Sequence, residues 1–323
     1  MPNKTTPTRC GLTLSRATVP LQKAWRGGDA APLTIPKTFN FEHAEVEDLA
    51  GLGRLLLRLQ DNPFAAVIRG GIADPTRAEG VRRLTAPDPV TGEPATLVEL
   101  PRRWVALDLD NVPLPAGAAP RDLSACARHA LALLPAAFRA AGCVVQATAS
   151  HGIKPGARLR LWFWLSRPAL GAELARWLAG SPVDSSCFRA GQLIFTARPR
   201  FVGMPDPLPC RLALLPGADA VEVPPTAALR PPSPPPRPQR AAIADDGAGA
   251  LVWGRAYIAS APLGARHDTA LRVAGWLFAL AREGRVRAEA IAPAITAGLI
   301  AAGKTESEAR DICRYIAAKE GAR

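Results

Sequence analysis

The pattern of apolar and polar residues predicts a chain that mixes strands and helices. Leu49, Leu52, Leu56 and Leu59 recur at helical spacing, which predicts an amphipathic helix over residues 47–59. Short apolar runs bounded by glycine, proline or polar turns are typical of strands. They occur at residues 12–15, 37–41, 64–68, 105–109, 143–149, 158–165 and 192–197. Two further helices are expected at residues 122–141 and 171–179. We therefore expect an α+β domain over residues 1–222.

The pattern changes after residue 222. Residues 223–248 are rich in proline, cannot bury a core and predict an extended linker. Beyond them the apolar residues again follow helical spacing, with helices expected at residues 270–282, 288–302 and 305–319. Residues 249–323 are therefore expected to form a small all-α domain.

Two aspartates interrupt the strand expected at the centre of the first domain. Residues 104–113 read Trp-Val-Ala-Leu-Asp-Leu-Asp-Asn-Val-Pro, so Asp108 and Asp110 lie two positions apart. Their side chains point to the same face of a strand, with Cα atoms about 6–7 Å apart. Like charges held this close need compensation, which solvent, an arginine or a pair of divalent cations could supply.

A hairpin further along the chain carries hydrogen-bond donors. The strand at residues 143–149 leads into a loop with Ser150, His151 and Lys154, and the return strand carries Arg158 and Arg160. All five side chains can donate to oxyanions, so they suit the triphosphate of a nucleotide. A basic hairpin exposed to solvent is the simpler alternative.

The net charge of the chain favours an anionic partner. Lys and Arg number 40 against 28 Asp and Glu, a formal charge of +12. Such a balance indicates nucleic acid, although a GC-rich genome would also raise the arginine content. The arginines expected to contact a DNA backbone are Arg69, Arg82, Arg83, Arg102 and Arg103.

Cysteine spacing and hydropathy argue against a zinc site and against a membrane protein. The six cysteines include no CxxC pair, so no zinc site is expected. The start of the chain is polar and no apolar run reaches about 18 residues, so we expect no membrane partner. A reducing cytoplasm is the expected location.

Taken together, these segments resemble the archaeo-eukaryotic primases, the primase-polymerase superfamily, over about residues 12–215. Leu107-Asp108-Leu109-Asp110 resembles the first motif, with two metal-binding aspartates. Ala149-Ser150-His151-Gly152 and the strand after it resemble the second, which contacts the nucleotide. Val183-Asp184 resembles the third motif, with Asp206 as its rival.

The resemblance implies an RRM-like catalytic core preceded by an α/β unit. It implies primer synthesis on single-stranded DNA from nucleoside triphosphates, with Mg²⁺ or Mn²⁺ held by Asp108, Asp110 and Asp184. The segment Phe195–Pro199 and the helical tail are similar to primases of plasmids, phages and integrative elements, which implies a replicative helicase as a further partner. Many family members carry the second-motif histidine on the return strand, where this chain has Arg158 or Arg160.

Two other functions fit parts of the sequence. Asp108-Leu109-Asp110-Asn111-Val112 also matches the nucleophile motif of haloacid-dehalogenase-like phosphatases. That motif normally opens its domain, whereas about one hundred residues precede it here. A replication initiator that binds DNA without catalysis could use the same fold.

Overall fold

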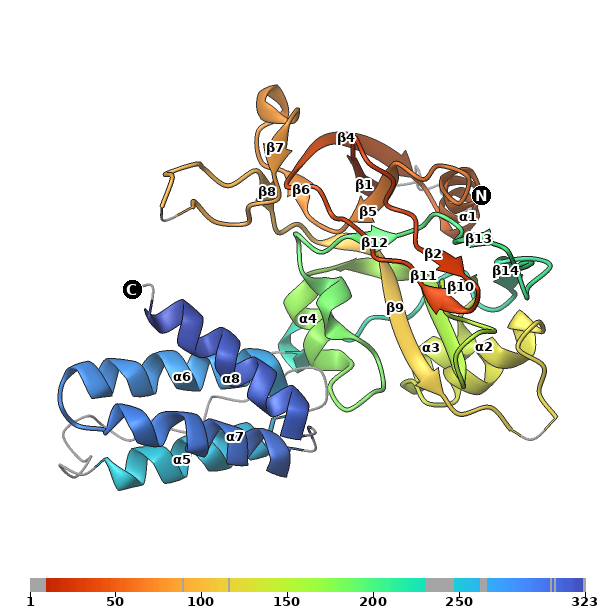
Figure 1. The fold of residues 1–323 in the computed structure, drawn as a ribbon. Coiled ribbons are helices and arrows are strands. Elements are labelled where there is room, and N and C mark those ends of the chain that lie inside the picture. The colour runs from red at the N-terminus through yellow and green to blue at the C-terminus, as the bar shows by residue number, and fades with distance from the viewer. Residues whose placement is uncertain are drawn as a thin grey trace. The chain divides into compact units, whose positions relative to one another are not determined.

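Two antiparallel sheets share a hydrophobic core in the N-terminal part of the computed structural model (Figure 1). The structure describes residues 10–88, 90–115, 117–229, 247–261, 266–302, 304 and 306–321. The chain divides into two compact units, Met1–Arg230 and Pro231–Arg323. Its α+β class agrees with the sequence prediction.

The first sheet has five strands in the order β12-β5-β1-β4-β7. They span Ile194–Phe195, Ala65–Ile68, Cys10–Arg16, Thr38–Val46 and Val81–Arg82. Helix α1 (Leu49–Leu59) begins where the Asp48 side chain accepts a hydrogen bond from the Gly51 amide. Its leucines at 3.6-residue spacing are buried against the sheets, as the sequence predicted.

The second sheet has four antiparallel strands in the order β14-β10-β11-β9. They span Leu212–Leu215, Cys143–Ala147, Ala157–Ala169 and Arg102–Val112. The β10–β11 hairpin predicted from the sequence is present, and β11 pairs with β9 on its other side along most of its length. Strand β9 lies at one edge of this sheet.

Each face of the second sheet packs against a different layer. The face with Trp104, Ala106 and Trp162 packs on the first sheet and α1. The opposite face, with Leu107 and Phe163, packs on helices α2 (Leu123–Leu131), α3 (Ala136–Ala140) and α4 (Gly171–Trp177). Side chains therefore alternate along β9 between two cores, and the aspartates lie on the face turned to the first sheet.

The single helix expected at residues 122–141 is broken into α2 and α3. Pro135 separates them, because proline has no amide hydrogen to donate and disfavours helical conformation in the residue before it. Asp122 caps α2 by accepting a hydrogen bond from the Ala125 amide.

Short elements complete the first unit. Strand β13 (Arg200–Val202) pairs with β2 (Ala24–Arg26), which pairs with β3 (Asp29–Ala30). Strand β6 (Gly71–Ile72) pairs with β8 (Leu97–Val98), and single turns of 3₁₀ helix form at η1 (Pro75–Arg77), η2 (Ser185–Phe188) and η3 (Thr226–Leu229). Val223 and Leu229 are buried in the core of this unit, so the start of the expected linker packs against it. Residues 230–246 of that linker lie outside the described residues.

The second unit is helical, with α5 (Ala248–Ala259), α6 (Arg266–Arg282), η5 (Ala288–Ala290), α7 (Ile291–Ala301) and α8 (Glu306–Gly321). Its core contains apolar side chains from all four α-helices. Helix α5 starts earlier than the helices expected in this region.

Candidate active site

Strand β9 presents the two predicted aspartates on one side of the second sheet. The side chain of Asp108 is 17% exposed, and that of Asp110, nearer the strand end, is 64% exposed. The register of β9 against β11 shifts between Ala157 and Leu159, and Asn111 takes a left-handed φ of 57°. This bulge bends the strand end beside Asp110.

Asp184 joins the two aspartates from a distant part of the chain. Its amide donates a hydrogen bond of 2.9 Å to the Asp108 carbonyl oxygen. Its carboxylate is exposed and caps η2, accepting from the Ser186 amide at 2.8 Å and from the Ser186 hydroxyl at 2.7 Å. We call Asp108, Asp110 and Asp184 the aspartate site.

Two arginines of β11 face the aspartate site across the strand pair. Arg160 lies opposite Asp108 in the register and donates to its Oδ2 atom at 2.6 Å. Arg158 donates to Oδ1 of Asp110 at 3.2 Å. Burial lowers the pKa of Arg160, but the Asp108 carboxylate, together with Cys187 and Asp110, raises it overall. Arg160 therefore stays charged. Of the three groups that could compensate the charges of Asp108 and Asp110, the structure shows arginines in contact with them.

The aspartate site has the donor chemistry of a divalent-cation site. Mg²⁺ and Mn²⁺ prefer carboxylate oxygens, and Oδ1 of Asp108 is buried without a hydrogen-bond partner. The residues that the structure describes contain no group of three His, Cys, Asp or Glu arranged to hold a metal ion. The carboxylates of Asp108 and Asp110 thus fit a cation, whereas that of Asp184 would have to turn away from its cap.

His151 is held inside the protein rather than facing the aspartate site. Its side chain is fully buried, Nδ1 accepts from the Arg158 amide at 3.0 Å, and Nε2 lies 2.8 Å from the Pro120 carbonyl oxygen. With both nitrogens engaged, a neutral imidazole with its proton on Nε2 satisfies both bonds. The prediction that His151 donates to a nucleotide is corrected: it positions the strand that carries Arg158.

Acidification is expected to destabilise the first unit through His151. Burial lowers its pKa below the usual value of about 6.5, so the unfolded chain binds the proton more readily. The free energy of unfolding should therefore fall as the pH drops below about 6.5. Urea denaturation between pH 8 and 5 should show a weaker pH dependence in His151→Gln than in wild type. His43→Gln, on the exposed part of β4, should keep the wild-type dependence, and three equal slopes would contradict the prediction.

The other two loop donors predicted from the sequence remain accessible. Ser150 is half-buried and its carbonyl oxygen accepts from the amides of Ile153 and Lys154, which closes the hairpin turn. The Lys154 side chain is exposed. The loop is held to strand β2 because Trp25 Nε1 donates to the Ala149 carbonyl oxygen at 2.8 Å.

Two of the arginines predicted to contact DNA are buried. Arg69 is 1% exposed and donates to the carbonyl oxygens of Trp104 and Ala169. Arg102 is 4% exposed and donates to the carbonyl oxygens of Arg69 and Gly70. Burial lowers the pKa of Arg69 to about 10 and also lowers that of Arg102. The prediction that these two contact a DNA backbone is wrong, because their guanidinium groups satisfy buried carbonyls.

The other three arginines of that group lie nearer the surface. Arg82 pairs with Asp88 and Glu93, each at 2.6 Å. Arg83 donates to the Gly191 carbonyl oxygen and lines a cavity of about 420 Å³. Arg103 is half-buried and lines a larger cavity.

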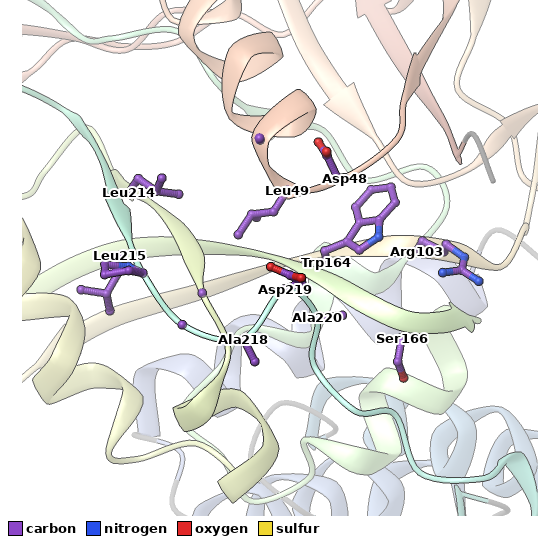
Figure 2. Close-up of a pocket in the computed structure, with 14 residues that line it drawn as sticks. Asp48, Leu49, Arg103, Trp164, Ser166, Leu214, Leu215, Ala218, Asp219 and Ala220 are labelled. Carbon is purple, nitrogen blue, oxygen red and sulfur yellow. The ribbon is translucent and has the colours of Figure 1, made fainter. Parts of the chain in front are cut away.

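This larger cavity, of about 630 Å³, lies between the start of α1 and the second sheet (Figure 2). Asp48 and Asp219 border it, and Trp164 and Leu49 supply apolar walls. Trp164 pairs with Trp104, four residues before Asp108 on β9, so about 13 Å of strand separate the cavity from the aspartate site.

The structure gives Asp206 a different role from the one predicted, and it adds two residues that were not predicted near Arg160. Asp206, the rival third carboxylate, is paired at 2.7 Å with Arg211, so it stabilises its own loop. Gln146 and Lys23 border a cavity of about 40 Å³ beside Arg160 and were not predicted. A polar Gln146 inside an apolar strand was the available signal, whereas nothing in the sequence links Lys23 to this strand.

Comparison with models of protein families, with curated proteins and with solved structures finds no match for this chain. Across the described ranges, no helix combines the length and apolar character needed to cross a membrane.

Proposed function

We propose that the protein is a DNA-directed primase-polymerase of a mobile genetic element, a nucleotidyltransferase that makes primers on single-stranded DNA. The observation that carries the proposal is the hydrogen bond between the Asp184 amide and the Asp108 carbonyl oxygen. It brings the backbone of a third aspartate, distant in sequence, against the strand that carries the other two. The resemblance to primases names the same three residues as metal ligands.

In this proposal Asp108 and Asp110 hold Mg²⁺ or Mn²⁺, and Asp184 completes the set after leaving its cap. Bound there, the ions would supply activation of the attacking hydroxyl and charge stabilisation at the leaving pyrophosphate. Arg158 and Arg160 orient the triphosphate by charge-assisted hydrogen bonds. Ser150 and Lys154 lie in the adjoining loop and add donors at the surface.

The template and the helical unit belong to the same proposal. Arg83 and Arg103 are the predicted DNA contacts that line cavities, so they are the arginines we retain for the backbone of single-stranded DNA. The helical unit is proposed to assist initiation by holding the template or the first nucleotide, or by recruiting a replicative helicase. The cytoplasm remains the proposed location.

The second sheet supports an RRM-like core in part. Strands β9 and β10 are joined through α2, and β11 is inserted between them, which is a split β-α-β arrangement. The fourth strand, β14, pairs with β10 instead of β9. An RRM places its fourth strand beside the first, so the proposed core is a variant of that topology.

The two alternatives are not equally supported. A phosphatase of the haloacid-dehalogenase type has its aspartates on a parallel, doubly wound sheet, whereas β9 is an edge strand of an antiparallel sheet. A DNA-binding initiator without catalysis is compatible with the fold, and it is the alternative that the following experiment distinguishes.

The proposal is tested by incorporation of labelled nucleotide on single-stranded DNA without a primer, in Mg²⁺ or Mn²⁺. We expect short products from wild type and at least about a hundredfold loss in Asp184→Asn, because asparagine keeps the η2 cap but is a poor cation ligand. Asp206→Asn is the matched control, since Asp206 pairs with Arg211. It should lower stability and leave incorporation per folded molecule unchanged.

Each other result would revise the proposal. Extension of a supplied primer without synthesis of new primers would retain the polymerase and remove the initiation role of the helical unit. Tight DNA binding without incorporation under any condition would favour the initiator.

A further inference from the structure

The residues proposed to bind the cation are paired with the residues proposed to bind the triphosphate. Asp108 pairs with Arg160 at 2.6 Å and Asp110 with Arg158 at 3.2 Å, on adjacent strands. Within these two pairs the positive and negative charges therefore balance. A triphosphate could not take hydrogen bonds from both guanidinium groups, nor a cation the Oδ2 oxygen of Asp108, without breaking these pairs.

Each ligand alone would leave an unfavourable charge behind. A divalent cation at Asp108 would lie close to the guanidinium of Arg160, which is 9% exposed, so the repulsion would be weakly screened. A triphosphate that drew Arg158 and Arg160 away would expose its phosphates to two unpaired carboxylates. When both ligands bind, the carboxylates contact the cation and the arginines contact the phosphates.

The surroundings of Arg160 allow this change of partner. Its Nη1 atom donates to the Phe195 carbonyl oxygen at 2.6 Å, which anchors the guanidinium independently of Asp108. The cavity of about 40 Å³ beside it is also bordered by Lys23, a second cation. Oδ1 of Asp108 is buried without a partner, so this carboxylate keeps an oxygen ready for a further ligand.

We propose that the ion pairs of Arg158 with Asp110 and of Arg160 with Asp108 act as a lock, which opens when the carboxylates contact a cation and the arginines contact a triphosphate. The cation and the triphosphate therefore bind cooperatively. This inference rests on the proposed function for the identity of the two ligands. Cooperativity is reciprocal: whatever the triphosphate does to cation affinity, the cation does to triphosphate affinity. The lock would disfavour metal loading in the absence of nucleotide.

The test titrates each ligand alone, which avoids complexes between metal and nucleotide in solution. Calorimetry with Mn²⁺ and no nucleotide should show about tenfold tighter binding in Arg158→Gln and Arg160→Gln than in wild type, the scale of one partly screened ion pair. Arg160→Lys keeps the charge and should stay near wild type. Inorganic tripolyphosphate without metal should bind about tenfold tighter to Asp108→Asn and weaker to Arg158→Gln.

Arg167 provides the matched control. It lies on the same strand and pairs with Glu173 at 2.8 Å, away from the aspartate site, so Arg167→Gln should change neither titration. Melting curves establish that each variant is folded. Arg158, the more exposed of the two, keeps the test valid if Arg160→Gln does not fold.

The lock is overturned if Mn²⁺ binds equally or more weakly to the folded arginine variants, or if neither wild type nor variants bind it. These titrations do not depend on turnover. Tighter Mn²⁺ binding in the variants together with absent incorporation by wild type would retain the lock and reject the primase. Incorporation by wild type without tighter Mn²⁺ binding in the variants would reject the lock alone.

Discussion

Asp108→Asn is expected to abolish nucleotide incorporation on single-stranded DNA. The substitution removes the negative charge from the most buried member of the aspartate site, beside an oxygen that has no protein partner. Charge stabilisation by a bound cation is worth several kcal/mol, so we expect a loss of about 10³-fold or more. Measurement of initial rates with labelled nucleotide in Mg²⁺ and in Mn²⁺ checks this.

The fold should survive this change because the amide oxygen of asparagine can still accept from Arg160. Asp108→Ala would remove the acceptor oxygen as well as the counter-charge of a buried guanidinium, which is strongly destabilising, so alanine is the poorer test. Asp122→Asn is the control, since asparagine caps α2 as well as aspartate does. An Asp108→Asn variant with more than a tenth of wild-type activity would rule out Asp108 as a metal ligand.

The local part of the aspartate site could be predicted from the sequence. Alternation along a strand placed Asp108 and Asp110 on one face, and both lie on β9. Their pairing with Arg160 and Arg158 could not be specified, because it depends on the register between β9 and β11 and on the bulge near Asn111. Such register is set by turns and packing elsewhere in the chain.

Contacts between residues distant in sequence could not be predicted from the sequence. The order of motifs suggested that Asp184 belongs with the first two aspartates, but no spacing rule gives its bond to the Asp108 carbonyl oxygen. His151 had the right chemistry for an oxyanion contact, yet its two nitrogens are used within the protein. Residue type limits what a side chain can do, and tertiary packing decides which partner it finds.

Tertiary packing also explains why Arg69 and Arg102, predicted to contact DNA, are buried. Arg69 follows a short apolar strand and precedes two glycines, a pattern that is typical of an ordinary glycine turn and that can also bring a guanidinium to a phosphate. In the structure its guanidinium joins the first sheet to the second, because Arg69 directly follows β5 while its acceptors are Trp104 on β9 and Ala169 on β11. Its role is therefore predicted to be structural.

Arg69→Met is expected to destabilise the first unit by about 3 kcal/mol. Methionine fills much of the space, but two buried carbonyl oxygens lose charge-assisted hydrogen bonds, each worth about 1.5–3 kcal/mol. The stacking of the guanidinium on the Trp104 ring, 5.6 Å from its centroid, is lost as well. Arg69→Lys should cost about half as much, because one ammonium group cannot span both acceptors.

Urea denaturation followed by circular dichroism measures both variants against a matched arginine. Arg16 ends the neighbouring strand β1, is 38% exposed and pairs with Glu42, so Arg16→Met should change the free energy of unfolding by less than about 1 kcal/mol. If Arg69→Met matched Arg16→Met in stability but lost affinity for single-stranded DNA, Arg69 would be a DNA contact after all. A large loss of stability with unchanged DNA affinity per folded molecule is the result that its burial predicts.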